Sequence, residues 1–142
     1  MKTTSTFLLL FSSTFLLVNA ISSHAQDLEI ASNDSGEPVH LYKKVNESLT
    51  MGHTKRALNI FDEVVEFYEH EGRLTELPAN YLGMALSLAL NGNYSESIRY
   101  HKKALRAHRK YKGNEPNDEI RFNLGLAYQL AGKERKAKRI LN

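Results

Sequence analysis

The stretch that decides the fold is FNLGLAYQLAGKERKAKRIL, which runs from Phe122 to Leu141. Its apolar residues recur at intervals of three and four, the period of an amphipathic helix. The pattern stops at Gly132 and resumes from Ala137. Because a glycine just past a helix end can take a left-handed conformation without steric cost, the stretch predicts two helices joined by a tight turn.

The same arrangement occurs twice more upstream. Three glycines are spaced 40 residues apart. A small residue lies five positions after each glycine, and another repeat-related residue lies seven positions before it. These residues are Gly52, Gly92 and Gly132, then Ala57, Ser97 and Ala137, then Val45, Ala85 and Gly125. Small residues let antiparallel helices approach toward the lower part of the usual ~8–10 Å axis separation. We therefore predict an all-α chain of three helical hairpins.

The apolar periodicity and the turn residues give approximate bounds for six helices. We place them near residues 39–51, 54–71, 75–91, 94–112, 117–131 and 134–141. Pro78 and Pro116 suit the first turns of the third and fifth helices, where a missing N–H costs nothing.

The hairpins resemble the tetratricopeptide repeat. The last one carries its pattern at Leu124, Gly125, Tyr128, Gly132, Ala137 and Leu141. The middle one carries it at Tyr81, Met84, Ala85, Leu88, Gly92, Tyr94, Ser97, Ala104 and Leu105, and the first at Leu41, Val45, Gly52, Ala57 and Phe61. Lys44 and Ser48 depart from the pattern, and Arg121 stands where the family often has tryptophan.

The period of 40 is longer than the family's common period of about 34. In this respect ALRAHRKYKGNEPNDEIRFNLGLAY (Ala104–Tyr128) is similar to the longer repeats of kinesin light chains and bacterial sensor proteins. The resemblance implies an α-α superhelix of three repeats, over about 39–74, 75–114 and 115–142, with the first helix of each hairpin lining a concave face. It also implies a protein-binding role.

Residues 1–25 fit a secretory signal peptide. A basic start at Lys2 precedes the apolar run Phe7–Val18, and small residues lead up to Ala25. We favour cleavage after Ala25 over cleavage after Ala20. A retained membrane anchor is the alternative, but the run is shorter than the ~20 apolar residues of a spanning helix. We expect a flexible leader over residues 26–38 and an exported, periplasmic or secreted bacterial protein, held by packing alone because it has no cysteine.

The sequence lacks the patterns that support catalysis or cofactor binding. It has no cysteine nucleophile, no glycine-rich phosphate loop and no zinc-binding helix with paired histidines. His101 and His108 are seven residues apart, roughly 10 Å along a helix, which is too far for one metal ion. His101 is related by the repeat to Phe61 and Leu141, which favours a histidine packed between helices. We predict no enzymatic activity, no cofactor and no metal.

Repeat-related positions of the first helices form a largely apolar ladder. The candidate partner-binding residues on it are Tyr42, Asn46, Leu82, Leu86, Leu90, Phe122, Leu126 and Leu130, with Thr50 at the polar end. One interpretation is a groove for an extended or helical peptide, and the other is burial against neighbouring helices. The family's basic clamp for acidic peptide C-termini is matched only in part, at Arg121 and Asn123.

Charge is distributed unevenly along the chain. Residues 26–96 have a net charge of −7, and residues 97–142 have a net charge of +9. The candidate anion-binding residues are Arg99, Lys102, Lys103, Arg106, Arg109 and Lys110. One interpretation is a site for an anionic partner. We favour the other, in which these bases lie opposite the acids of the preceding repeat, at Asp62, Glu63, Glu66 and Glu69.

The sequence as a whole predicts an exported protein-interaction module that binds a peptide or a partner protein. The alternatives are a small anion-binding periplasmic protein and a fragment of a sensor or assembly factor. Nucleic acid is excluded as a partner by the expected export. We also expect that no further helix covers the side of Tyr128 and Leu124, which would allow self-association through the last hairpin.

Overall fold

The structure is a computed structural model that describes residues 38–142. The expected signal peptide, and all of the expected leader except Pro38, lie outside the described residues. The described residues form helices and turns and no strand. The elements are α2 (Val39–Thr50), α3 (Thr54–His70), η1 (Leu74–Glu76), α4 (Leu77–Leu90), α5 (Tyr94–Tyr111), α6 (Asp118–Leu130) and α7 (Glu134–Leu141).

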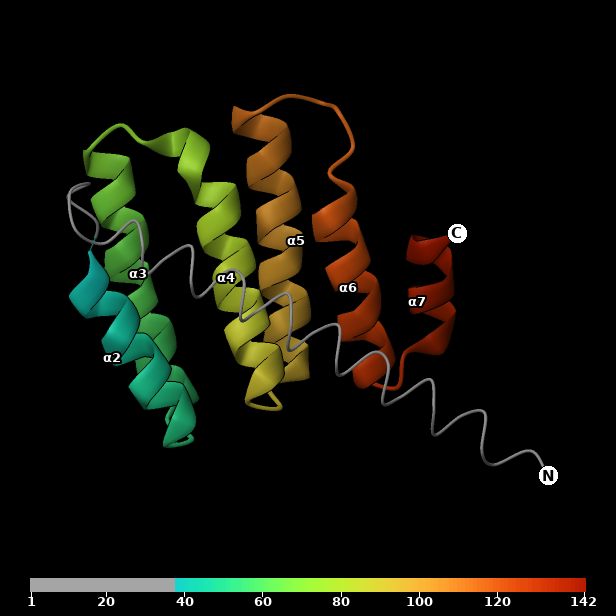
Figure 1. The fold of residues 1–142 in the computed structure, drawn as a ribbon, viewed down its shortest axis with the longest axis horizontal. Coiled ribbons are helices and arrows are strands. Elements are labelled where there is room, and N and C mark those ends of the chain that lie inside the picture. Colours follow the sequence, from blue (N-terminus) through green and yellow to red (C-terminus); the bar gives the residue numbers. More distant parts are fainter. Residues whose placement is uncertain (1–37) are drawn as a thin grey trace. The chain divides into compact units, whose positions relative to one another are not determined.

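The six α-helices pair along the chain as three hairpins, α2–α3, α4–α5 and α6–α7 (Figure 1). Neighbouring hairpins pack through α3 against α4 and through α5 against α6. The first helices also contact one another, α2 with α4 and α4 with α6. This confirms, for residues 38–142, an all-α repeat architecture of six helices.

Each hairpin turn uses the same backbone hydrogen bonds. At the last turn the Gly132 N–H donates to the Gln129 carbonyl at 2.9 Å, and the Lys133 N–H donates to the Tyr128 carbonyl at 2.8 Å. Gly132 has φ +69°, and Gly52 and Gly92 have φ +76° and +74° with equivalent bonds. This pair of bonds closes the carbonyl end of a helix through a left-handed residue, so the conformation expected of these glycines is confirmed.

Small residues stand where the helices of a hairpin cross. Ala57, Ala85, Ser97 and Ala137 are at most 1% exposed. Gly125 in α6 is also buried, and its missing side chain leaves the space that Leu141 of α7 occupies. The turns are further joined across hairpins, because the Thr54 hydroxyl donates to Asn93 Oδ1 at 3.0 Å.

Two apolar clusters hold the described helices together. The larger joins α2, α3, α4 and α5 around Phe61, whose ring packs 5.7 Å from Tyr100 and 6.0 Å from Tyr81, centroid to centroid. The smaller joins α5, α6 and α7 around Leu124 and Tyr128. The expectation that one side of Leu124 and Tyr128 stays uncovered is therefore wrong: both are buried, at 2% and 6% exposure, against residues of α5 and α7.

Two helix starts differ from the sequence expectation. The third helix begins at Leu77 after the short turn Leu74–Glu76, and Pro78 lies in its first turn as expected. The fifth begins at Asp118, so Pro116 lies outside it. Asn117 sets that start, because its Oδ1 accepts from the Ile120 N–H at 2.9 Å and so satisfies a backbone donor that the first turn leaves open.

Candidate functional site

The first helices carry repeat-related side chains in three rows, which we call the first-helix ladder. The rows are Tyr42, Leu82 and Phe122, then Asn46, Leu86 and Leu126, then Thr50, Leu90 and Leu130. The helices that carry the rows are neighbours, because α2 contacts α4 and α4 contacts α6. The row members on α2 include the exposed polar residues Asn46 and Thr50, whereas those on α4 and α6 are all apolar.

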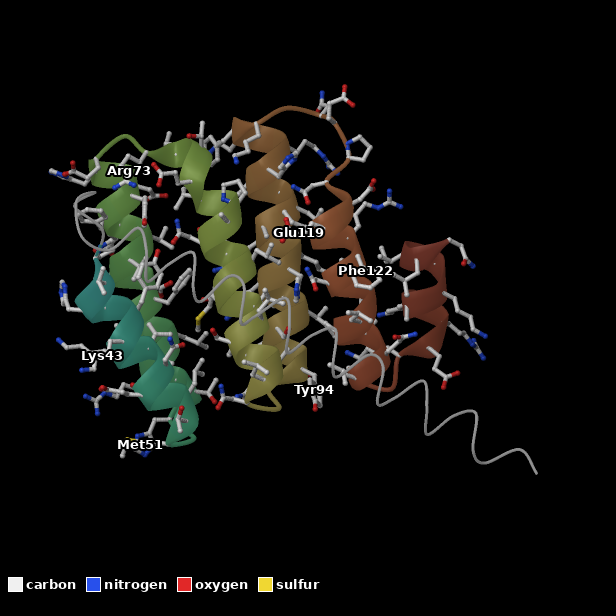
Figure 2. All side chains as sticks on the ribbon, in the orientation of Figure 1. Lys43, Met51, Arg73, Tyr94, Glu119 and Phe122 are labelled. Atoms are coloured by element: carbon white, nitrogen blue, oxygen red, sulfur yellow. The ribbon has the colours of Figure 1, made fainter. Side chains whose placement is uncertain are left out.

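Two ladder residues expose large apolar side chains. Leu90 at the end of α4 is 49% exposed, and Phe122 on α6, labelled in Figure 2, is 46% exposed. Leu82, Leu86 and Leu126 are buried, yet they belong to neither of the two apolar clusters that hold the hairpins together. Burial, the second interpretation of the ladder, therefore holds for these three leucines, and Tyr42 packs against the larger cluster. The large apolar side chains that the ladder exposes are those of Leu90 and Phe122.

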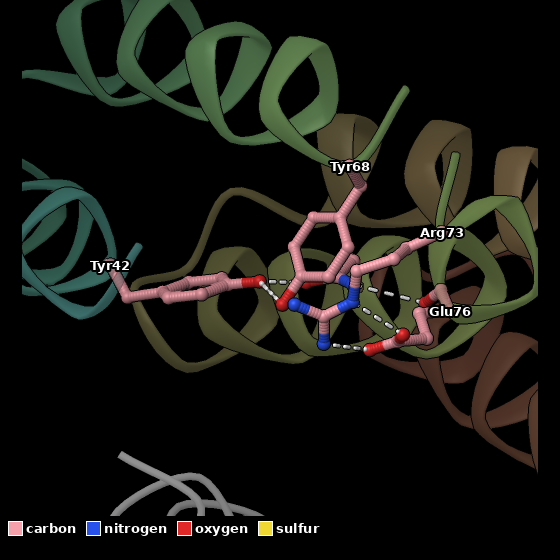
Figure 3. Close-up of polar contacts among 5 residues, drawn as sticks. Tyr42, Tyr68, Arg73 and Glu76 are labelled. Atoms are coloured by element: carbon pink, nitrogen blue, oxygen red, sulfur yellow. Dashed lines mark hydrogen bonds and ion pairs between the residues drawn. The ribbon is translucent and has the colours of Figure 1, made fainter. Parts of the chain in front are cut away.

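The α2 end of the ladder is polar. The Tyr42 hydroxyl donates to Asn80 Oδ1 on α4 and lies 3.4 Å from the Tyr68 hydroxyl on α3 (Figure 3). Arg73 makes a two-point ion pair with Glu76, at 2.7 Å from Nε and 2.6 Å from a terminal nitrogen, and its guanidinium lies 4.9 Å from the centroid of the Tyr68 ring. These bonds fix the orientation of α2 and α3 relative to the start of α4.

The residues predicted for anion binding all lie on α5. Arg99, Lys102, Arg106, Arg109 and Lys110 are exposed, and Lys103 is half-buried. The bases are also close to aromatic rings. Lys103 Nζ lies 4.5 Å from the Tyr100 centroid and 5.6 Å from the Tyr81 centroid. Desolvation, followed by the charge of Arg99, lowers the pKa of Lys103.

The bases of α5 do not form the expected ion pairs with the acids of α3. Among residues 38–142, Arg99 pairs with Glu96 of its own helix at 2.5 Å, and no ion pair joins α3 to α5. The contacts that join α3 to α5 are aromatic: Phe61 of α3 packs 5.7 Å from Tyr100 of α5, and Tyr81 of α4 packs against both rings. The expected pairing between adjacent repeats is therefore wrong at contact distance, although the acids lie close enough to act electrostatically. Desolvation first, and then the charge of Asp62, raise the pKa of Tyr100 to about 12.

The side chain of His101, on α5, is buried, as the interpretation of a packed histidine predicted. It is 1% exposed, and its Nδ1 donates to the Ser97 carbonyl at 2.9 Å. Its other ring nitrogen, Nε2, is buried without a hydrogen-bond partner. Desolvation lowers the pKa of His101 to about 4, against a smaller opposite effect of the Ser97 bond. The ring is therefore neutral at pH 7.

Sequence reasoning missed the polar group at the start of α4. Asn80 and Glu76 fall on an apolar helix and its preceding turn, where no periodic pattern marks them. The turn at Gly72, which has φ +69°, was predicted, since it falls between the helices expected near 54–71 and 75–91. The ion pair that Arg73 makes beside it was not.

Within residues 38–142, no three His, Cys, Asp or Glu side chains lie close enough to hold a metal ion. None of the helices described is both long enough and apolar enough to cross a membrane.

Comparison with known proteins identifies a repeat family for the second half of the chain. The family described as "Tetratricopeptide repeat" matches residues 76–142, which hold α4 to α7. No curated protein and no solved structure matches the chain. The similarity to kinesin light chains stays a prediction. Proteins of this repeat family are generally non-enzymatic and serve protein–protein interaction, which fits a structure of paired helices with an apolar ladder. Residues 76–142 of this chain belong to the tetratricopeptide repeat family.

Proposed function

We propose that the chain is an exported protein-interaction module whose first-helix ladder binds an apolar segment of a partner protein, as a helix or an extended strand. The family assignment supports the general role in protein binding. The proposed export rests on the signal-peptide pattern of residues 1–25.

The observation that carries the proposed binding surface is the pair of exposed ladder residues. Leu90 and Phe122 leave nearly half of their surface open to water on adjacent first helices. Phe122 lies in the row of Leu82, and Leu90 lies eight residues further along α4, roughly 12 Å at the rise of a helix. A peptide that reaches both must therefore lie along the ladder. An apolar peptide helix would bury both residues and continue the contacts of Leu130, the half-buried member of the row of Leu90.

A peptide-binding measurement tests this surface. The probe is a panel of fluorescent synthetic peptides of about 15 residues, with Leu and Phe at helical spacing, together with scrambled sequences of the same composition. Binding is followed by anisotropy. We expect at least one patterned peptide to bind, and Phe122→Glu and Leu90→Glu to weaken it by about tenfold or more, since each places a charge against apolar surface.

Met51→Glu is the matched control, because Met51 is a 69% exposed apolar residue at the end of α2 that is not a ladder member. Binding should also persist in raised salt, because burial of apolar surface is not screened. Equal affinity of wild type, Phe122→Glu and Leu90→Glu would place the binding surface elsewhere. Failure of every patterned peptide would remove the proposal.

A further inference from the structure

The second helices α3 and α5 expose opposite charges at repeat-related positions. On α3 the acidic stripe is Asp62, Glu66 and Glu69, and on α5 the basic stripe is Lys102, Arg106 and Arg109. All six side chains are exposed. Each stripe has the spacing i, i+4, i+7, which keeps it on one face of its helix. The two stripes are related residue by residue through the 40-residue interval.

The stripes lie on the same side of the array, but they do not neutralise each other there. Desolvation first, and then the charge of Glu69, raise the pKa of Tyr81, and Asp62 acts in the same way on Tyr100 of α5. The Phe61 ring of α3 packs 5.7 Å from the Tyr100 ring of α5, centroid to centroid, so the two second helices are neighbours. Nevertheless, no ion pair joins the two helices within the described part of the chain, so both stripes remain open to an outside partner.

We propose that two copies of the chain associate through this surface, with α3 of each copy against α5 of the other. A two-fold axis that runs parallel to the helices, between α3 and α5, produces this arrangement. This rotation places α3 of one copy over α5 of the other. Each residue keeps its position along the direction of the helices. Asp62, Glu66 and Glu69 then lie opposite Lys102, Arg106 and Arg109 of the second copy, and the same contacts form again on the other side of the axis.

The pattern of signs favours a second copy over other anionic partners. A uniformly anionic surface, such as a lipid membrane, would be attracted by the basic stripe but repelled by the acidic stripe beside it. A second copy presents both signs at matching spacing, so every member of both stripes finds an opposite charge. Since exposed ion pairs are individually weak, the dimer should be weak and should depend strongly on salt.

Sedimentation equilibrium of the purified chain tests the proposal. At low salt, about 0.02 M, we expect a monomer–dimer equilibrium, and at about 0.5 M we expect its dissociation constant to rise by about tenfold or more. Reversing the acids (Glu66→Lys with Glu69→Lys) or the bases (Arg106→Glu with Arg109→Glu) should each give monomers. Circular dichroism checks that the helices remain, which exposed positions should allow.

The decisive samples combine the two reversals. An equimolar mixture of the acid-reversed and base-reversed chains should form a heterodimer, because both contacts then pair opposite charges again. The chain that carries all four substitutions should form a homodimer. Lys43→Glu with Lys44→Glu is the control, since these exposed bases lie on α2, away from both stripes, and it should dimerise like wild type.

Two results would overturn the proposal. One is a wild-type chain that stays monomeric at low salt up to about 0.1 mM, a concentration at which even a weak dimer forms. If that monomer binds vesicles containing phosphatidylglycerol, the basic stripe is instead a lipid-binding surface. The other is a dimer that persists in both reversed variants, which would place the interface elsewhere. Neither result bears on peptide binding by the first-helix ladder.

Discussion

The side chain of Leu141 on α7 occupies the space beside Gly125 on α6 that a side chain at position 125 would need. A Cβ atom at Gly125 would lie 2.5 Å from Cδ2 and 2.6 Å from Cγ of Leu141, well inside van der Waals contact. Gly125 of α6 and Leu141, the last residue of α7, therefore pack as a matched pair.

We expect Gly125→Ala to have opposite effects in two backgrounds. In the wild type, the gain in helix propensity of about 1 kcal/mol is offset by overpacking of about 1–3 kcal/mol against Leu141. In a Leu141→Ala chain there is no overpacking, so the same change should stabilise the protein. Urea unfolding of the four chains measures the coupling. Identical effects in both backgrounds would mean that Leu141 moves aside without cost.

The last turn should not tolerate a branched residue at its glycine. Gly132 has φ +69°, where a β-branched side chain clashes with its own backbone. We expect Gly132→Val to lower the free energy of unfolding by about 1–3 kcal/mol. Lys133→Val is the control, because Lys133 has φ −98°. Thermal unfolding compares the two, and equal midpoints would contradict the left-handed turn.

Stability should fall on acidification through His101. Burial lowers its pKa to about 4 from an ordinary 6.5, so below pH 6.5 the unfolded chain binds a proton that the folded chain does not. The resulting loss begins near pH 6.5, grows to about 3 kcal/mol by pH 4, and then levels off. Chemical unfolding at a series of pH values measures this loss.

His101→Phe should remove this dependence, since phenylalanine holds the equivalent position 61 and carries no titratable group. His108→Gln, on the same helix but half-exposed, should keep the wild-type profile. A wild-type profile that is retained in His101→Phe would assign the pH dependence to other groups.

The proposed export predicts a definite amino terminus for the mature chain. Cleavage after Ala25 leaves Gln26 as the first residue, whereas cleavage after Ala20 leaves Ile21. Mass spectrometry of the intact chain from the envelope fraction of the cells distinguishes the two, and Ala25→Lys should block the favoured cleavage. An intact chain that still begins at Met1 would support the retained anchor instead.

Much of the local structure was predictable because it depends on local sequence. Of the six predicted helices, the third starts furthest from its predicted position, at Leu77 in place of residue 75. The start of α6 lies one residue from its predicted position, and it depends on one side chain, Asn117, which stands among other turn-forming residues. Pro116 carried the stronger statistical signal for a first turn, but the hydrogen bond of Asn117 places the first turn after it.

The sequence by itself determined the hairpins of this protein. These hairpins depend on the apolar period, on the left-handed glycines and on the small residues where the helices cross. Each of these features acts over a few residues of backbone, so its effect does not depend on the rest of the fold. The interpretation of His101 as a packed residue followed from the same repeat, since apolar residues hold the equivalent positions.

Only the tertiary structure decided which side chains remain available to a partner. It buries Leu124 and Tyr128 against α5 and α7 while it leaves Leu90 and Phe122 exposed. Among residues 38–142 it also forms no ion pair between the acids of α3 and the bases of α5. These outcomes depend on distances between helices that are set by the packed side chains between them, such as Tyr81. A periodic pattern specifies the face of a helix, but the neighbouring helices determine how much of that face is covered.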